Sequence, residues 1–280
     1  MKWVGRQGSG NVQDRRGMGG RVAVGGGLGG LVILLLSLFF GDGSFLPGDV
    51  NTNTGLAEQQ EYTPTEEENE RAQFVSVVLK DTEDVWNRLI EEQGGSYVEP
   101  TLVLFTGSTQ SGCGYASAAT GPFYCPPDSK LYIDLSFYDD LSARFGASGD
   151  FAMAYVIAHE VGHHVQNLMG VTGEVDAQRG RLSEKQMNAL SVKLELQADF
   201  YAGVWAHHAQ KMKDILEPGD IEEALNAANA IGDDRLQRQS QGYVVPDAFT
   251  HGTSKQRMYW FKKGFDSGEL SEGNTFDEVE

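Results

Sequence analysis

The chain has 280 residues, enough for one sizeable core or for a domain with appendages. Its formal net charge of −18 at pH 7 argues against nucleic acid as a partner, because phosphate binding needs a basic face. The charge is unevenly distributed: residues 1–21 hold five basic side chains against one acidic one, so the excess of acid lies in the rest of the chain.

Residues 22–41 form a run of twenty amino acids without a charge, bounded by Arg21 and Asp42. A helix of that length spans about 30 Å, the thickness of the hydrocarbon core of a bilayer. A cleaved signal peptide, a buried core helix and a glycine-rich linker are the alternatives, and the first of these lacks an Ala-x-Ala cleavage site. The run predicts an uncleaved transmembrane helix. The basic flank predicts a single-pass inner-membrane protein with residues 1–21 in the cytoplasm and the remainder outside it.

Residues 42–65 are polar and rich in turn-forming residues, which is typical of a linker, and residues 66–280 are expected to form one domain. A helix is predicted from the acidic residues 66–68 to the pair Gly94-Gly95, followed by a strand within "YVEPTLVLFTG". The segment "KLYIDLSF" alternates apolar and polar residues, as a strand with one buried face does. The acidic tail beyond about Ser267 is expected to be frayed.

Cys113 and Cys125 are the two cysteines of the chain and lie in a glycine- and proline-rich stretch. An even pair on the exported side of a membrane predicts a disulfide, which would stabilise the fold by about 3 kcal/mol for a loop of this size. Two free buried thiols are the alternative. A cysteine metal site is not expected, because no further soft ligand lies nearby.

The stretch "AYVIAHEVGHHVQ" holds three of the six histidines of the chain. His159 and His163 are four positions apart, so on a helix both imidazoles project from one face and suit a tetrahedral Zn²⁺ ion. Glu160 is turned by about 100° from His159 and can instead reach a water on the metal, which is the position of a general base. His164 lies off this face and is expected to have no role at the metal. The alternative is a pair of core histidines bonded to backbone carbonyls.

A second helical stretch, "SVKLELQADFYAGVWAHHAQ", places Glu195 and Asp199 on one face. Acidic side chains among so many apolar neighbours are costly to bury without a partner. Glu195 is therefore expected as the third zinc ligand, with Asp199 accepting the ring N–H of a histidine ligand. Two alternatives stay open: Asp199 on the metal with Glu195 outside, or an ordinary salt bridge to Lys193 or Arg181.

In "THGTSKQR", His251 precedes a glycine and Arg257 follows six residues later, with Thr253 or Ser254 available as a helix cap. Metallopeptidases often add a cationic or phenolic group that stabilises the oxyanion beside zinc. His251 is expected in this catalytic role, with Tyr243 and Arg257 as further candidates. A capping or structural histidine is the alternative.

These motifs, together with "GPFYCPPDSKLYIDLSFYDDL" and "FTHGTSKQRMYWFKKGF", resemble the bacterial family of predicted neutral zinc metallopeptidases, and the ligand pattern looks like that of gluzincins. The resemblance implies an α+β, zincin-like metallopeptidase domain, mainly helical with a small sheet. It also implies a membrane-tethered enzyme with one Zn²⁺ per chain. "KLYIDLSF" would then be the edge strand along which a peptide lies, although from its residues alone it is equally a core strand.

The sequence thus predicts a membrane-anchored zinc metallopeptidase that hydrolyses peptides or proteins outside the cytoplasm, with Glu160 as general base on a zinc-bound water. The main rival is a catalytically inactive, zinc-stabilised binding or chaperone protein on the same anchor. Glu160 argues against that rival, because a structural zinc site closes with a fourth protein ligand. A second rival, a hydrolase acting on other bonds, would use the same ligands.

Overall fold

The computed structural model describes residues 1–17 and 62–277. The fold of these residues is α+β, mainly helical with a small sheet, as predicted. The strands are β1 (Val12–Asp14), β2 (Thr101–Phe105), β3 (Ser108–Ser111), β4 (Gly114–Ser117), β5 (Phe123–Cys125) and β6 (Lys130–Asp134). The α-helices are α2 (Glu66–Glu92), α3 (Phe137–Ala143), α4 (Asp150–Leu168), α5 (Val171–Asp176), α6 (Glu184–Lys213), α7 (Asp220–Ala230), α8 (Asp233–Gln241) and α9 (Ser254–Ser267). Short 3₁₀ turns are η1 (Ala118–Thr120), η2 (Pro246–Ala248) and η3 (Leu270–Glu272).

The main sheet has the strand order β1-β2-β6-β5, in which β1, β2 and β6 run parallel and β5 runs antiparallel to β6. β6 therefore lies between two neighbours, and the prediction that "KLYIDLSF" is the edge strand is wrong. The edge strands are β1 and β5, and the sequence did not indicate β5 because three residues between two prolines are too short for a visible alternation. The predicted disulfide is present: Cys113 joins Cys125 at the end of β5.

The amino-terminal segment belongs to the same folded unit as the rest of the described chain. Strand β1 pairs with β2, with Val12 opposite Leu102. The α-amino group of Met1 donates a hydrogen bond of 2.6 Å to Asp150 and one of 3.3 Å to Asp220, at the first turns of α4 and α7. A bilayer between residues 1–21 and the domain would separate these partners, so the predicted single-pass topology is wrong.

No helix within residues 1–17 and 62–277 is both long and apolar enough to cross a membrane. The predicted transmembrane helix, residues 22–41, and the linker up to residue 61 lie outside the described residues.

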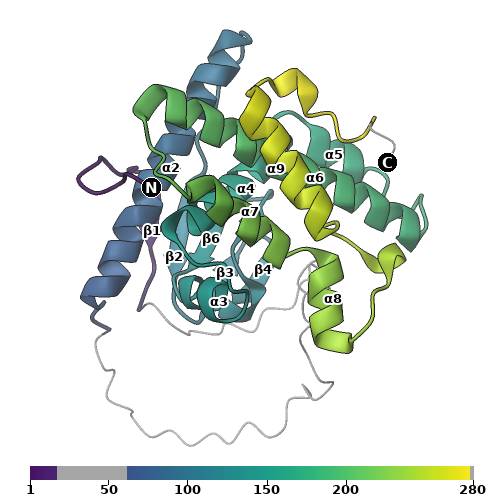
Figure 1. Ribbon diagram of the computed structural model, residues 1–280, viewed down its shortest axis with the longest axis horizontal. Helices are drawn as coiled ribbons and strands as arrows, with labels where there is room; N and C mark the ends of the chain where they lie inside the picture. Colours follow the sequence, from purple (N-terminus) through teal and green to yellow (C-terminus); the bar gives the residue numbers. More distant parts are fainter. Residues whose placement is uncertain (18–61, 278–280) are drawn as a thin grey trace, which may run out of the picture.

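Helix α4 lies at the centre of the structure, packed against α2, α6, α7 and the edge strand β5 (Figure 1). Its sequence is apolar on nearly every side, which requires burial all round. Gly162 lets α4 approach α6 closely, because a Cβ at this position would lie 2.9 Å from the carbonyl oxygen of Ala198. The close approach brings the histidine face of α4 against the acidic face of α6.

Helix α9 packs across α6, and the backbones of the two helices lie in close contact. A Cβ added at Gly264 would lie 2.1 Å from the carbonyl oxygen of Phe200, so only glycine fits there. The helix begins at the predicted cap: Thr253 accepts a hydrogen bond from the backbone of Gln256, whose side chain accepts one from the backbone of Thr253. The crossing carries Arg257, in the first turn of α9, to the carboxylate of Asp199.

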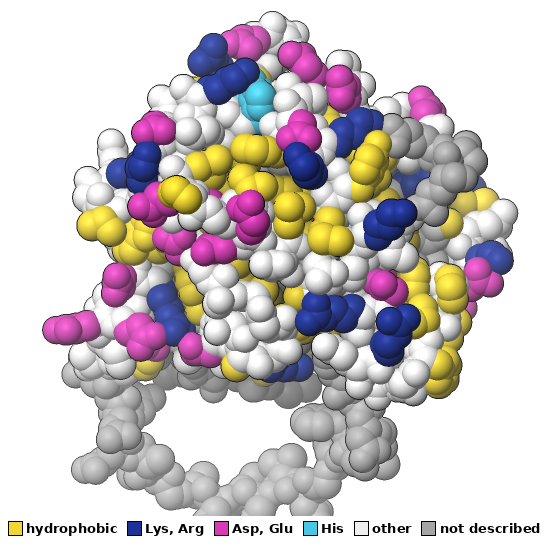
Figure 2. All heavy atoms as spheres, in the orientation of Figure 1, with side chains coloured by type: hydrophobic (Ala, Val, Ile, Leu, Met, Phe, Trp, Pro, Cys, Tyr) yellow, Lys and Arg dark blue, Asp and Glu magenta, His cyan; other side chains and the backbone are white. Residues whose placement is uncertain are grey.

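The carboxyl-terminal segment is docked on α6 as far as Phe276, so the expectation that it is frayed beyond Ser267 is wrong for this part. Thr275 donates a hydrogen bond to the carbonyl oxygen of Lys193 at 2.6 Å, and Lys193 donates one to the carbonyl oxygen of Phe276 at 2.9 Å. On the face of the molecule in Figure 2, side chains of both charge signs are interspersed with apolar ones. The acidic excess of the sequence therefore does not form one continuous block on that face.

Candidate active site

Three side chains converge where α4 faces α6. His159, His163 and Glu195 each offer a ligand atom, and these atoms lie within 4.8 Å of one another. The Nε2 atom of His159 is 3.1 Å from one carboxylate oxygen of Glu195, and the Nε2 atom of His163 is 3.5 Å from the other. Two imidazole nitrogens and a carboxylate form a donor set that suits Zn²⁺, so the residues present fit the ion.

The Nδ1 atom of each histidine, on the side of the ring away from Glu195, is hydrogen-bonded to a further side chain. Nδ1 of His159 lies 2.8 Å from Asp199, and Nδ1 of His163 lies 2.9 Å from the amide oxygen of Gln166. Because both partners accept, each Nδ1 carries a proton, and each Nε2 faces the carboxylate of Glu195. Asp199 thus lies where the sequence predicts a carboxylate behind a histidine, and Gln166 supplies a second support that was not predicted.

The electrostatics of the cluster are those of closely packed opposite charges. Burial lowers the pKa of His159, but the carboxylate of Asp199 outweighs it and raises this pKa to about 10. Burial raises the pKa of Glu195, while His163 and His251 outweigh it and hold the pKa well below its usual value. The cluster therefore favours a positive charge between the imidazoles and the carboxylate, which a bound cation also provides.

Glu160 is buried beside the two histidines, and its burial raises the pKa of its carboxyl group despite their proximity. The backbone N–H of Tyr124, in the edge strand β5, faces this carboxylate and stabilises its charged form. Glu160 therefore adjoins both the candidate metal ligands and β5, which is an edge strand of the sheet within the described residues.

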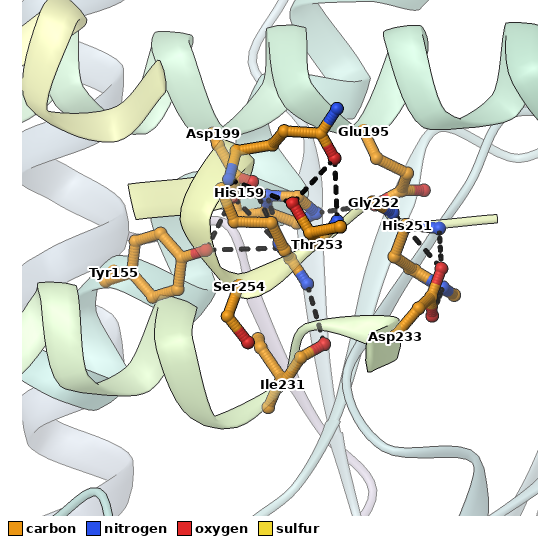
Figure 3. Close-up of polar contacts among 12 residues, drawn as sticks. Tyr155, His159, Glu195, Asp199, Ile231, Asp233, His251, Gly252, Thr253 and Ser254 are labelled. Atoms are coloured by element: carbon orange, nitrogen blue, oxygen red, sulfur yellow. Dashed lines mark hydrogen bonds and ion pairs between the residues drawn. The ribbon is translucent and has the colours of Figure 1, made fainter. Parts of the chain in front are cut away.

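Asp199 is the centre of a buried polar network (Figure 3). Its oxygens accept hydrogen bonds from Arg257 at 2.8 and 3.0 Å and a further one from the hydroxyl of Tyr155. Burial raises the pKa of Asp199, but Arg257 and His159 outweigh it and lower the pKa to about 2. Arg257 was a further candidate for oxyanion stabilisation. Only 2% of it is exposed, and it lies behind Asp199 rather than at the open side of the cluster.

His251 lies beside Glu195, next to Asp233 (Figure 3). Its Nδ1 atom is 2.9 Å from the hydroxyl of Thr250 and 3.4 Å from Asp233. Asp233 also accepts the backbone N–H groups of residues 250–252, which fixes the loop that carries the histidine. By contrast Tyr243, the phenolic candidate, is 62% exposed on the loop after α8.

The sequence argument missed Gln166, Tyr155 and Asp233. Gln166 could have been found, since it follows His163 by three residues on the same helix and must share its face. Asp233 has no such local signal. It lies 18 residues before His251 and reaches it only because the start of α8 packs against the start of α9.

The His-Glu-x-x-His helix α4, set against the acidic face of α6, presents the ligand pattern of zinc metallopeptidases. The chain belongs to the family described as "Putative neutral zinc metallopeptidase", whose model matches residues 1–276. It is 51% identical over 284 aligned positions, 99% of each chain, to the uncharacterized protein YpfJ of Escherichia coli strain K12. It is 45% identical to the uncharacterized protein Rv2575 of Mycobacterium tuberculosis, over 69% of this chain and 66% of the relative. No solved structure matches the chain significantly.

Proposed function

We propose that this protein is a peptidase whose zinc ion is held by His159, His163 and Glu195. The observation that carries the proposal is the convergence of two histidine Nε2 atoms and one carboxylate. The Nδ1 atom of each histidine is already hydrogen-bonded to another side chain. The side chains of His163 and Glu195 remain 17% and 15% exposed. The site therefore opens to solvent on one side, as a site that admits a substrate must.

When bound, zinc supplies Lewis acidity, which polarises a scissile carbonyl and lowers the pKa of a coordinated water. Glu160 takes up a proton from the attacking water at its carboxylate and passes it to the nitrogen of the leaving segment. Asp199 holds the ring of His159 in the orientation that exposes Nε2. His251, held by Asp233, stands beside Glu195 as the group that donates a hydrogen bond to the developing oxyanion.

The substrate is an extended peptide that lies along the free edge of β5. That edge adjoins Glu160, and its backbone groups can pair with a peptide backbone as a neighbouring strand would. Recognition through the backbone accepts many sequences, so the expected substrates are unfolded proteins or peptides rather than one folded partner.

The test combines zinc content with hydrolysis of fluorescein-labelled casein by the full chain. Wild-type protein is expected to hold one zinc per chain and to cleave casein. Glu160→Gln should keep the zinc and lose activity by a factor of about 100 or more, because only the proton carrier is removed. Glu195→Gln should instead lower the zinc content.

Glu184→Gln, an exposed substitution in the first turn of α6, is the matched control and should change neither quantity. Zinc retained by Glu195→Gln at wild-type affinity would refute the ligand assignment. A wild-type protein that binds zinc but cleaves no peptide would support the rival reading of a zinc-stabilised binding protein.

A further inference from the structure

The third histidine of the motif, His164, is completely buried and connects α4 to the edge strand β5. Its Nδ1 atom lies 3.0 Å from the hydroxyl of Tyr124, and its Nε2 atom lies 2.6 Å from the carbonyl oxygen of Val98. Asn167, also on α4, donates a hydrogen bond of 3.1 Å to the same Tyr124 hydroxyl. One tyrosine of the edge strand is therefore held by two side chains of the helix that carries Glu160.

The directions of these hydrogen bonds follow from the chemistry of the partners. A carbonyl oxygen only accepts, so Nε2 of His164 carries the proton and donates to Val98. Nδ1 is then an acceptor and takes the proton of the Tyr124 hydroxyl, whose oxygen in turn accepts from Asn167. Both ring nitrogens of His164 and the Tyr124 hydroxyl are thus satisfied with a neutral imidazole, which is the state that burial favours.

The position of strand β5 depends on side-chain contacts as well as on strand pairing, and the ring of Phe123 stacks on that of Tyr132 in β6. Strand β5 is three residues long and pairs with one strand, β6, through Phe123 opposite Tyr132 and Cys125 opposite Lys130. The disulfide holds its far end at Cys125. Tyr124 is the middle residue, and its backbone N–H is the group that faces the carboxylate of Glu160.

We propose that Tyr124, clamped by His164 and Asn167, is a positioning residue that sets the separation between the peptide-binding edge of β5 and Glu160. The effect of this clamp on catalysis rests on the proposed function, since it concerns how a peptide substrate is placed beside Glu160. The clamp itself stands on the hydrogen bonds alone. His164 thus has a role at the site without being a ligand.

Tyr124→Phe tests the clamp, because it keeps the ring and removes the hydroxyl. Tyr97→Phe is a matched control: its ring also packs edge-on against His164, with centroids 5.7 Å apart, but its buried hydroxyl has no hydrogen-bond partner. The readout is hydrogen exchange of the amides of residues 123–125, measured by mass spectrometry on the full zinc-loaded chain. Exchange is expected to accelerate on the order of tenfold in Tyr124→Phe and to stay unchanged in Tyr97→Phe.

Asn167→Ala removes one of the two hydrogen bonds to the hydroxyl and should give a smaller acceleration than Tyr124→Phe. Wild-type exchange rates in Tyr124→Phe would overturn the clamp. Equal acceleration in both tyrosine variants would also overturn it, because ring packing and not the hydroxyl would then hold the strand.

The functional part is read from casein hydrolysis with zinc content measured on the same samples. Tyr124→Phe should keep its zinc and raise KM several-fold, with a smaller change in kcat, because the binding edge is displaced while the ligands are not. An unchanged KM beside faster exchange would overturn the positioning role. If the wild-type protein cleaves no peptide, the proposed function fails, whereas the exchange experiment still decides whether the clamp exists.

Discussion

The amide oxygen of Gln166 lies 2.9 Å from Nδ1 of His163, one turn earlier on α4. The amide nitrogen of Gln166 donates to the carbonyl oxygen of Leu194 at 2.6 Å, and this contact fixes which end of the amide faces the histidine. The two candidate ligands are therefore supported differently, His159 by a carboxylate and His163 by a neutral amide. A carboxylate makes an imidazole a more basic ligand than an amide does, so His159 is expected to bind the metal more strongly.

Gln166→Leu should lower the zinc affinity about 10- to 100-fold, because His163 loses the partner that fixes its ring and its tautomer. The measurement is a competition titration against a chromophoric zinc chelator. Gln239→Leu, an exposed glutamine on α8, serves as the control and should leave the affinity unchanged. An unaltered affinity in Gln166→Leu would show that packing alone orients His163.

Arg257→Met should destabilise the protein by about 3–5 kcal/mol, because the buried carboxylate of Asp199 loses its charged partner. Urea unfolding of the zinc-free protein measures this loss without a contribution from the metal. Lys262→Met on the same helix removes a surface pair with Asp266 and should cost about 1 kcal/mol at most. Unfolding of the two variants at the same urea concentration would contradict a stabilising role of the buried ion pair.

Gly162→Ala should destabilise the protein by about 1–3 kcal/mol and weaken zinc binding, since the added methyl group pushes α4 away from Ala198 and hence the histidines away from Glu195. Gly173→Ala in α5 is the control, because a Cβ added at this position would have no atom within 4 Å. It should leave zinc binding intact and stabilise slightly. Thermal unfolding and zinc titration of both variants provide the comparison.

The contact between α2 and α6 predicts a pH dependence of stability. Burial raises the pKa of Asp84, but hydrogen bonds from Lys213 and Lys80 outweigh it, so the folded-state pKa lies below 3.8. A depressed carboxyl pKa contributes stability that is complete above the unfolded value and is lost as the pH falls through the folded value. Asp84→Asn should therefore lose less stability than the wild type between about pH 5 and pH 3, as measured by urea unfolding. Parallel losses in the two proteins would contradict the shift.

The presence of the long helices, the extent of α2 and the metal motif were accessible from the sequence, because they depend on local periodicity. The helix predicted from residue 66 to the Gly94-Gly95 pair is α2, which ends at Glu92. His159 and His163 share a face because a helix repeats every 3.6 residues, and Glu195 and Asp199 share one for the same reason. The choice of Asp199 as a support could be argued from the cost of burying a carboxylate.

The prediction of localisation failed because it depends on long-range contacts rather than on local periodicity. The hydropathy of residues 22–41 was considered without reference to the rest of the chain. The position of residues 1–17, however, depends on contacts with residues far along the chain. Pairing of Val12 with Leu102, and of the Met1 amine with Asp150, leaves no trace in local composition.

The sequence by itself determined which side chains are candidate metal ligands, since the i, i+4 spacing of two histidines is a property of one helix. Only the tertiary structure decided what surrounds them: β5 as the edge strand, His164 bonded to Tyr124, and Asp233 beneath His251. These relationships arise where separate elements meet, and they depend on close packing at positions such as Gly162. Helical periodicity is a short-range property of the backbone, whereas the partner of a buried polar group is selected by the packing of the whole core.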